Sequence, residues 1–283
     1  MKHLVIFSDS SRENVARAVA DFTTWLGSRC RVQSVDLRTP GGPVNFENVD
    51  AAVVFGGDGS FLTAARRLGG CEIPLVGVNL GKLGFLAELS EDELRESLDD
   101  ILSGKHQPVK RLMLQARIER PDGTTGGPFL ALNDLVLRHV LPTHMLSFRL
   151  SVNGEEATDY AGDGLIISTP VGSTAYALSA GGPILTPGVQ CLVATPICPH
   201  ALANRSLVMT SRCELRLELL DPAEQAHITL DGRETASVMP GDVVVVTAAP
   251  HPLCLIETGK RTFFQTLREK MNWEGHPNYG PPG

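Results

Sequence analysis

The chain has 283 residues, of which 42% are hydrophobic and 20% charged, a composition typical of a soluble globular protein with one large or two smaller cores. Its formal net charge of −7 argues against a general attraction to nucleic acid or anionic membrane, and no run of roughly 18 apolar residues predicts a membrane span. The apolar run at residues 4–7 is too short for a signal peptide, and the scattered cysteines favour reduced thiols. We therefore expect a cytoplasmic protein without nucleic-acid or membrane partners.

Strand and helix signals alternate over the first hundred residues. Short apolar runs predict buried strands at residues 4–7, 51–55 and 74–79. Helically spaced apolar residues predict helices at 13–26 and 61–68, and a capping box of Ser90 and Glu93 begins a third helix that ends near Gly104. This alternation predicts a Rossmann-like α/β domain with a parallel sheet over residues 1–105.

After Gly104 the apolar residues recur at every second position. Leu112, Leu114, Ala116 and Ile118 form the first such run, and later runs end at the turn pairs Asn153-Gly154 and Asp231-Gly232. We therefore predict a β-rich, sandwich-like second domain over residues 106–250. The Gly/Pro-rich tail at residues 275–283 is predicted to be disordered.

The sequence Gly56-Gly57-Asp58-Gly59-Ser60 lies between a predicted strand and a predicted helix. Glycines let a backbone approach an anion closely, and the N–H groups at a helix start point toward it, so this segment predicts a phosphate cradle. A carboxylate repels phosphate, and Asp58 therefore needs another role: binding a divalent cation or accepting a proton from an attacking hydroxyl. The alternative is that Asp58 only caps the following helix.

A second glycine-rich loop, residues 79–86, follows the next predicted strand. Lys82 would supply a charge for phosphate and Phe85 an aromatic face for a base, unless Phe85 simply lies in the core. A third segment places Asn133 and Asp134 within an apolar run. An amide beside a carboxylate suits the recognition of ribose hydroxyls, whereas the alternative is a bulge or a turn.

The fourth segment, residues 163–183, is a buried strand followed by a loop dense in Ser, Thr and Gly. Such a loop offers hydroxyls and backbone N–H groups without charge, which fits a neutral or zwitterionic ligand. The cysteines do not indicate a metal site, because no second pair of ligands accompanies Cys191 and Cys198. We therefore predict no metal site built from the protein's own side chains.

These four segments, in this order and at these separations, resemble the NAD kinase family. The similarity runs from residue 51 to residue 273 and includes the segments 195–200, 204–208 and 264–273. The resemblance implies transfer of the γ-phosphoryl of ATP to the 2′-hydroxyl of the adenosine ribose of NAD, giving NADP. It also implies a C-terminal segment, residues 251–274, that returns to the first domain.

The resemblance also implies roles for individual residues. Asp58 corresponds to the general base for the ribose 2′-hydroxyl, with Gly59 beside it. Asn133 and Asp134 correspond to the pair that holds ribose hydroxyls, although Asp134 stands where Glu is common. Phe85 corresponds to an aromatic residue beside the adenine, and His144 to a position that contacts the dinucleotide. Asp163 corresponds to the acid near the nicotinamide carboxamide. The loop that lines the adenine and nicotinamide sites comprises Thr174, Ala175, Tyr176, Ala177, Leu178 and Ser179.

The phosphate side of the site would comprise Gly56, Gly57, Ser60, Lys82 and Arg233. A divalent cation, expected to be Mg²⁺, would bridge the phosphates of ATP. Inorganic polyphosphate is an alternative donor, and family membership implies a homodimer or homotetramer. Two other functions remain open from the residues: a lipid kinase that shares the GGDG loop, and a non-catalytic sensor that binds NAD.

Overall fold

The computed structural model describes residues 1–39, 44–81, 84–141, 144–221 and 225–272. The chain divides into two compact units, one of Met1–Val109 with Cys254–Gly283 and one of Lys110–Leu253. These bounds lie within a few residues of the predicted limits at 105 and 250. The tail predicted to be disordered lies outside the described residues.

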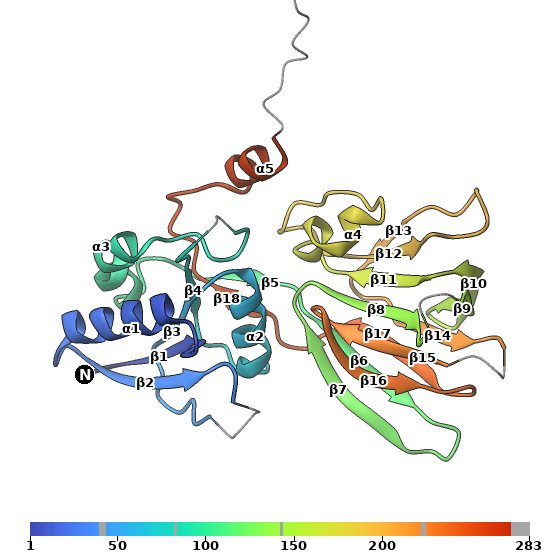
Figure 1. Cartoon of the computed structure of the whole chain (residues 1–283), viewed down its shortest axis with the longest axis horizontal. Helices are drawn as coiled ribbons and strands as arrows, with labels where there is room; N and C mark the ends of the chain where they lie inside the picture. The colour runs from blue at the N-terminus through green and yellow to red at the C-terminus, as the bar shows by residue number, and fades with distance from the viewer. Residues whose placement is uncertain (40–43, 82–83, 142–143, 222–224, 273–283) are drawn as a thin grey trace, which may run out of the picture. The chain divides into compact units, whose positions relative to one another are not determined.

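The first unit is built on a six-stranded sheet with the order β2-β1-β3-β4-β18-β5 (Figure 1). Its paired strands β1 to β4 and β18 run parallel. The strands are β1 (Lys2–Ser8), β2 (Cys30–Asp36), β3 (Ala51–Phe55), β4 (Leu75–Val78), β5 (Val109–Arg111) and β18 (Leu253–Leu255). The pattern had not predicted β2, because this edge strand is only partly buried and carries charged residues.

The helices that cover this sheet are α1 (Glu13–Leu26), α2 (Asp58–Leu68) and α3 (Glu91–Leu102), and α5 (Phe263–Met271) follows β18 near the end of the chain. The buried residues of α1 and α3 pack in one cluster with Leu4, Ile6 and Val53 of the sheet. The predicted capping box of Ser90 and Glu93 begins α3, and a second box of Thr262 and Gln265 begins α5. Within the described ranges, none of the helices has the length and apolarity that spanning a membrane would require.

The strand order places a topological switch at β1. The chain passes from β1 to β2 on one side and then to β3 on the other. In open parallel sheets, ligands bind beyond the carboxyl ends of the strands at such a point. The GGDG segment follows the carboxyl end of β3 and therefore occupies this position.

The second unit contains two six-stranded sheets, with the orders β10-β9-β14-β17-β6-β7 and β13-β12-β11-β8-β15-β16. All the strand pairs within them are antiparallel. The strands of the first sheet are β6 (Leu114–Glu119), β7 (Thr125–Ala131), β9 (Leu146–Val152), β10 (Glu155–Gly162), β14 (Leu215–Leu219) and β17 (Val243–Ala248). Those of the second are β8 (Asp134–His139), β11 (Gly164–Ser168), β12 (Cys191–Ile197), β13 (Leu207–Thr210), β15 (Ala226–Leu230) and β16 (Arg233–Val238).

Alternate residues of the two sheets form one shared core. Leu114, Ala116 and Ile118 of β6 pack in the same cluster as Leu135 and Leu137 of β8, which is the arrangement of a sandwich. The short helix α4 (Tyr176–Ser179) packs on part of the opposite face of the second sheet, where its Ala177 contacts Val136, Ile166 and Ile197. The predicted class, an α/β domain followed by a β-sandwich-like domain with a returning C-terminal segment, is therefore correct.

Candidate functional site

The Asp58 carboxylate is held by a row of backbone N–H groups at the carboxyl end of the parallel sheet. The N–H of Phe85 donates to Oδ2 at 3.0 Å, and those of Leu86 and Ala87 donate to Oδ1 at 3.1 and 3.4 Å. Gly57, not Asp58, occupies the N-cap position of α2, and Asp58 is the first helical residue. The alternative that Asp58 serves as a helix cap is therefore wrong, because its carboxylate is used to bind the loop after β4.

Close packing leaves no room for a Cβ atom at two glycines of these loops. A Cβ atom at Gly84 would overlap the carboxylate of Asp58, and one at Gly56 would lie 2.5 Å from Ser60 Oγ. Gly56 also has a φ of 147°, a conformation that favours glycine. The Asp58 side chain nevertheless keeps 30% of its surface exposed. It is thus fixed in orientation but open to a ligand.

Phe85 and Lys270 complete the surroundings of Asp58. Lys270, in the last turn of α5, places Nζ 3.6 Å from Asp58 Oδ2 and 4.7 Å from the centroid of the Phe85 ring. The Phe85 ring is half-buried and lies 6.0 Å from that of Phe263, also on α5. Phe85 is therefore neither fully in the core nor free of protein contacts.

In the second unit, a carboxylate organises the Asn133–Asp134 segment in a similar way. Asp231, in the turn between β15 and β16, accepts the N–H of Leu132 at 3.1 Å, of Asn133 at 2.8 Å and of Asp134 at 3.3 Å. Asn133 Oδ1 is buried and has no hydrogen-bond partner within the described residues. Leu132 and Asn133 form a bend between the end of β7 and Asp134, which begins β8, so the segment is a turn leading into a strand and not a bulge.

Asp134 lies in an environment that favours its neutral form. Its side chain is nearly completely buried at the end of the sheet. Burial, and secondarily the negative charge of Asp231, raise the pKa of Asp134 from 3.8 to about 7. The Asn133–Asp134 segment can therefore present both hydrogen-bond donors and acceptors near neutral pH.

The loop after β11 is fastened by hydroxyl groups. Ser173 is buried and donates from Oγ to the carbonyl of Pro170 at 2.6 Å, while Oγ accepts the N–H of Leu185 at 3.0 Å. Thr169 Oγ1 donates to the carbonyl of Leu132 at 2.6 Å and accepts the N–H of Gly172 at 3.1 Å. The loop is thus tied to the Asn133 segment, and a Cβ at Gly172 would overlap the carbonyl of Asn133.

The sequence of both units matches one family. Residues 4–106 match the ATP-NAD kinase N-terminal domain, and residues 132–258 match the ATP-NAD kinase C-terminal domain. The chain belongs to the NAD kinase family. The predicted family and its kinase function are thereby confirmed, and the lipid-kinase and sensor alternatives gain no support.

Relatives and solved structures agree with this assignment. The NAD kinase of Geobacter metallireducens is 40% identical, with 96% of this chain and 99% of that protein covered. The NAD kinase of Syntrophotalea carbinolica is 42% identical over 80% of this chain and 79% of its own. A yeast NADH kinase complexed with NADH has the same fold, with a TM-score of 0.89 at 22% identity, over 99% of this chain and 90% of its own. An Archaeoglobus fulgidus NAD kinase in complex with ATP has a TM-score of 0.76 at 25% identity, with 97% of this chain and 100% of that chain covered.

Within this NAD kinase fold, the predicted residues of the long loop lie on one short stretch of backbone. Thr174 Oγ1 donates to the carbonyl of Val171 at 3.3 Å, and Tyr176 is exposed at the start of α4. Ala177 is buried against the sheet, whereas Ser179 is exposed and Ala175 and Leu178 are intermediate. The exposed Tyr176 and Ser179 are therefore the members of this stretch best able to contact a ligand.

Three other predicted residues lie at the edges of the second unit. Asp163 stands between β10 and β11, where its carboxylate hydrogen-bonds the Cys198 thiol and so raises the pKa of that thiol. The ring of His144 is stacked on that of His139, with centroids 5.1 Å apart. Arg233 is exposed at the start of β16, directly after the Asp231 turn. Arg233 belongs to the second unit, whereas Gly56, Gly57 and Ser60, the other residues predicted to contact phosphate, belong to the first. Lys82, also predicted to contact phosphate, lies outside the described residues.

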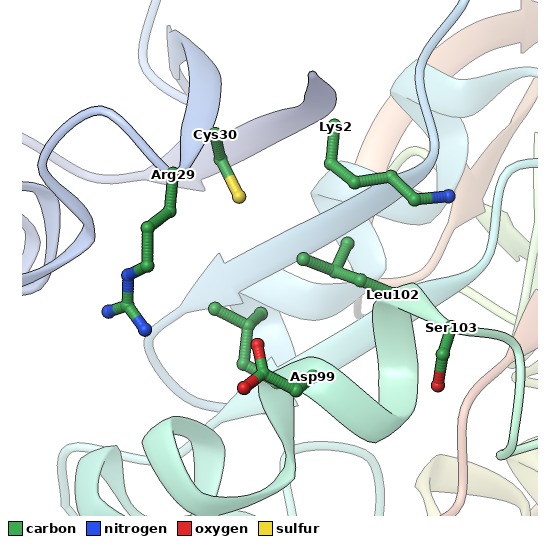
Figure 2. Close-up of a pocket in the computed structure, with 7 residues that line it drawn as sticks. Lys2, Arg29, Cys30, Asp99, Leu102 and Ser103 are labelled. Atoms are coloured by element: carbon green, nitrogen blue, oxygen red, sulfur yellow. The ribbon is translucent and has the colours of Figure 1, made fainter.

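A cavity of about 250 Å³ lies elsewhere in the first unit (Figure 2). Its walls include Lys2 and Cys30, which begin β1 and β2, and Asp99, Leu102 and Ser103 from the end of α3. This cavity is therefore at the amino ends of the strands, opposite the end at which parallel sheets bind ligands. We do not assign it to the kinase site.

Sequence reasoning missed two residues of the site. Asp231 was treated only as part of a turn, although a carboxylate at a position with φ of 50° beside a glycine could have suggested a special role. Lys270 carried no sequence signal, because a lysine in the last turn of an amphipathic helix is commonly a solvated residue.

Proposed function

We propose that this chain transfers the γ-phosphoryl group of ATP to the 2′-hydroxyl of the adenosine ribose of NAD, producing NADP. Asp58 would accept the proton of that hydroxyl as the new bond forms. The observation that carries this proposal is the fixed, partly exposed Asp58 carboxylate, which three consecutive N–H groups hold at the carboxyl end of β3. A base with a single orientation needs little reorganisation when the substrate reacts.

The second unit would bind the dinucleotide. Asn133 Oδ1 is a buried acceptor without a partner in the described structure, and such an atom is stabilised when a ligand hydroxyl donates to it. Asp134 beside it would accept a second hydrogen bond from the same ribose, or donate one to it. This use of both groups explains why an amide and a carboxyl are adjacent. Asp163, His144 and the stretch from Thr174 to Ser179 would contact the rest of the dinucleotide.

The phosphate donor would meet the N–H groups at the start of α2, with Gly56, Gly57 and Ser60 forming the cradle. In the described ranges, no three His, Cys, Asp or Glu side chains gather into a potential metal site. We expect a divalent ion, Mg²⁺, to enter with the nucleotide and to be held mainly by phosphate oxygens and water. When bound, it would neutralise phosphate charge.

The test of the base role is Asp58→Asn. We expect the affinity for NAD to be retained while turnover falls by about 10²–10⁴, the usual consequence of losing a general base. Asp50→Asn is a matched control, because the Asp50 carboxylate also accepts a backbone N–H, from His3 at 2.8 Å, and pairs with a lysine. Near-normal turnover in Asp58→Asn, or equal losses in both variants, would exclude the base role.

A donor-by-acceptor matrix tests the substrates. Purified protein would be given ATP or polyphosphate with NAD or NADH, each with and without Mg²⁺, and NADP or NADPH would be measured. We expect NADP from ATP and NAD with the metal present. Failure of every combination to form a phosphorylated dinucleotide would overturn the proposed activity.

We also propose that the protein works in the cytoplasm as a homo-oligomer. Six free cysteines support a reducing compartment. The exposed apolar side chains of Leu207 and Val208 on the edge strand β13 support self-association, because such an edge can pair with another copy. Light scattering of the purified protein would give a dimer or a tetramer, and a monomer at all concentrations would contradict this.

A further inference from the structure

Lys270 brings a positive charge to Asp58 from a helix near the end of the chain. The ammonium group lies 3.6 Å from Asp58 Oδ2 and 4.7 Å from the centroid of the Phe85 ring. The two charged side chains are 32% and 30% exposed. Solvent reaches both of them, and so can a ligand.

The contact between Lys270 and Asp58 is loose. Charge-assisted hydrogen bonds between nitrogen and oxygen span about 2.7–2.9 Å, and this pair is farther apart. The Asp58 oxygens instead accept the N–H groups of Phe85, Leu86 and Ala87. The Phe85 ring attracts the ammonium through its π-electrons, which leaves the N–H donors of Lys270 available to an anion.

The fold fixes the position of Lys270. Helix α5 begins at the capping box of Thr262 and Gln265, and its Leu267 is buried. The segment before α5 is fastened by the pairing of Leu255 with Leu75 and by the N–H of Thr258, which donates to Glu88 Oε1 at 3.1 Å. Lys270 therefore reaches Asp58 from an anchored helix.

We propose that Lys270 is a catalytic residue that binds the phosphoryl group during its transfer, an inference that rests on the proposed function. The hydroxyl oxygen of the acceptor forms a bond to the γ-phosphorus, and the bond from that phosphorus to the bridging oxygen breaks. The hydroxyl proton passes to Asp58, and ADP leaves. Lys270 keeps its proton and donates hydrogen bonds to non-bridging oxygens, offsetting the repulsion between phosphate and Asp58.

The alternative is that Lys270 only fastens α5 to Phe85. Three variants separate the two roles. Lys270→Met removes the charge but keeps much of the apolar stem, and Lys270→Arg keeps the charge. Lys260→Met is the third variant. Lys260 is the matched control, because it lies in the same C-terminal segment and pairs with Glu96 at 2.7 Å, on α3. For each variant, kcat, the KM for ATP and for NAD, and the melting temperature would be measured.

We expect Lys270→Met to lower kcat/KM for ATP by about 10²–10³, the usual effect of removing one group that stabilises transition-state charge. The KM for NAD and the melting temperature should remain those of the wild type. Lys270→Arg should recover activity to within roughly tenfold of the wild type, because the charge is kept, and Lys260→Met should be unaffected. Lys270→Met with activity within threefold of the wild type would overturn the proposal, as would equal losses in both Lys270 variants together with lower melting temperatures.

A binding measurement separates this inference from the proposed activity. Titration calorimetry with inorganic tripolyphosphate should show affinity roughly tenfold weaker for Lys270→Met than for the wild type. Equal affinities would overturn the role of Lys270 as a phosphate ligand. If the wild type made no NADP, the proposed function would fail, and the tripolyphosphate titration would still test Lys270.

Discussion

Asp231 Oδ1 accepts the backbone N–H of Asn133 at 2.8 Å, across 98 residues of sequence. The same carboxylate accepts the N–H groups of the residues on either side of Asn133. Asp58 holds the segment from Phe85 to Ala87 in the same manner. In each unit, therefore, one carboxylate fixes three consecutive amides next to residues assigned to the substrate, and the backbone there is ordered before a ligand arrives.

Replacing Asp231 by Asn should destabilise the protein and weaken NAD binding. Asn tolerates the φ of 50° at this position, so the backbone turn survives. In the wild type, the N–H of Leu132 donates to Asp231 Oδ2. The NH₂ group that replaces this oxygen in the variant cannot accept that hydrogen bond. We expect unfolding to become easier by about 1–3 kcal/mol and the KM for NAD to rise several-fold.

Urea unfolding and steady-state kinetics would measure these effects. Asp122→Asn is the control, because Asp122 also accepts a backbone N–H, from Thr124 at 2.9 Å, but in an exposed hairpin of the same unit. A KM for NAD that is unchanged in Asp231→Asn would show that this carboxylate does not organise the binding segment.

Replacing Gly84 by Ala should reduce turnover through Asp58. A Cβ at this position would overlap the Asp58 carboxylate, which must then move away from the N–H groups of Phe85 and Leu86. Because the proposed base loses its orientation, we expect a fall in kcat of roughly 10²-fold with little change in the KM for NAD.

Gly81→Ala tests the specificity of this effect. Among the described residues, the nearest atom to a Cβ at Gly81 is Asn79 Oδ1, at 4.0 Å, which is ordinary van der Waals contact. Equal kcat values for the two alanine variants would mean that the position of the Asp58 carboxylate does not limit catalysis.

The raised pKa of Asp134 predicts a pH-dependent stability. The folded protein binds a proton up to about pH 7 that the unfolded chain releases near 3.8. The contribution of protonated Asp134 to the free energy of unfolding is therefore complete at low pH, and it is lost as the pH rises from about 4 to about 7. The total is about 4 kcal/mol for a shift of roughly three pKa units.

Asp134→Asn removes this titration while preserving shape. The stability of the variant relative to the wild type should improve by about 4 kcal/mol between pH 4 and pH 8, measured by urea unfolding at each pH. Other groups titrate in both proteins and largely cancel in the difference. A difference that is constant with pH would mean that the carboxyl of Asp134 ionises in the fold as it does in the unfolded chain.

The sequence predicts those parts of the molecule that depend on local patterns. The alternation in β6 and the capping box at Ser90 are set by neighbours in the chain, and both were found as expected. Strand β2 was missed because an edge strand needs only one partner and tolerates charge. The contacts of Asp231 with Asn133 and of Lys270 with Asp58 were missed because they join residues about 100 and 200 positions apart, and no local pattern encodes them.

Replacing Gly172 by Ala should weaken NAD binding through the loop that follows β11. A Cβ at Gly172 would overlap the carbonyl of Asn133, which accepts the N–H of Thr169 at 2.9 Å. The loop and the Asn133 segment would then separate, and we expect the KM for NAD to rise about tenfold or more. Gly188→Ala is the control, because a Cβ there meets no atom of the described residues within 4 Å. If fluorescence titration with NAD gave the same affinity for both variants, the packing of the loop against Asn133 would have no part in dinucleotide recognition.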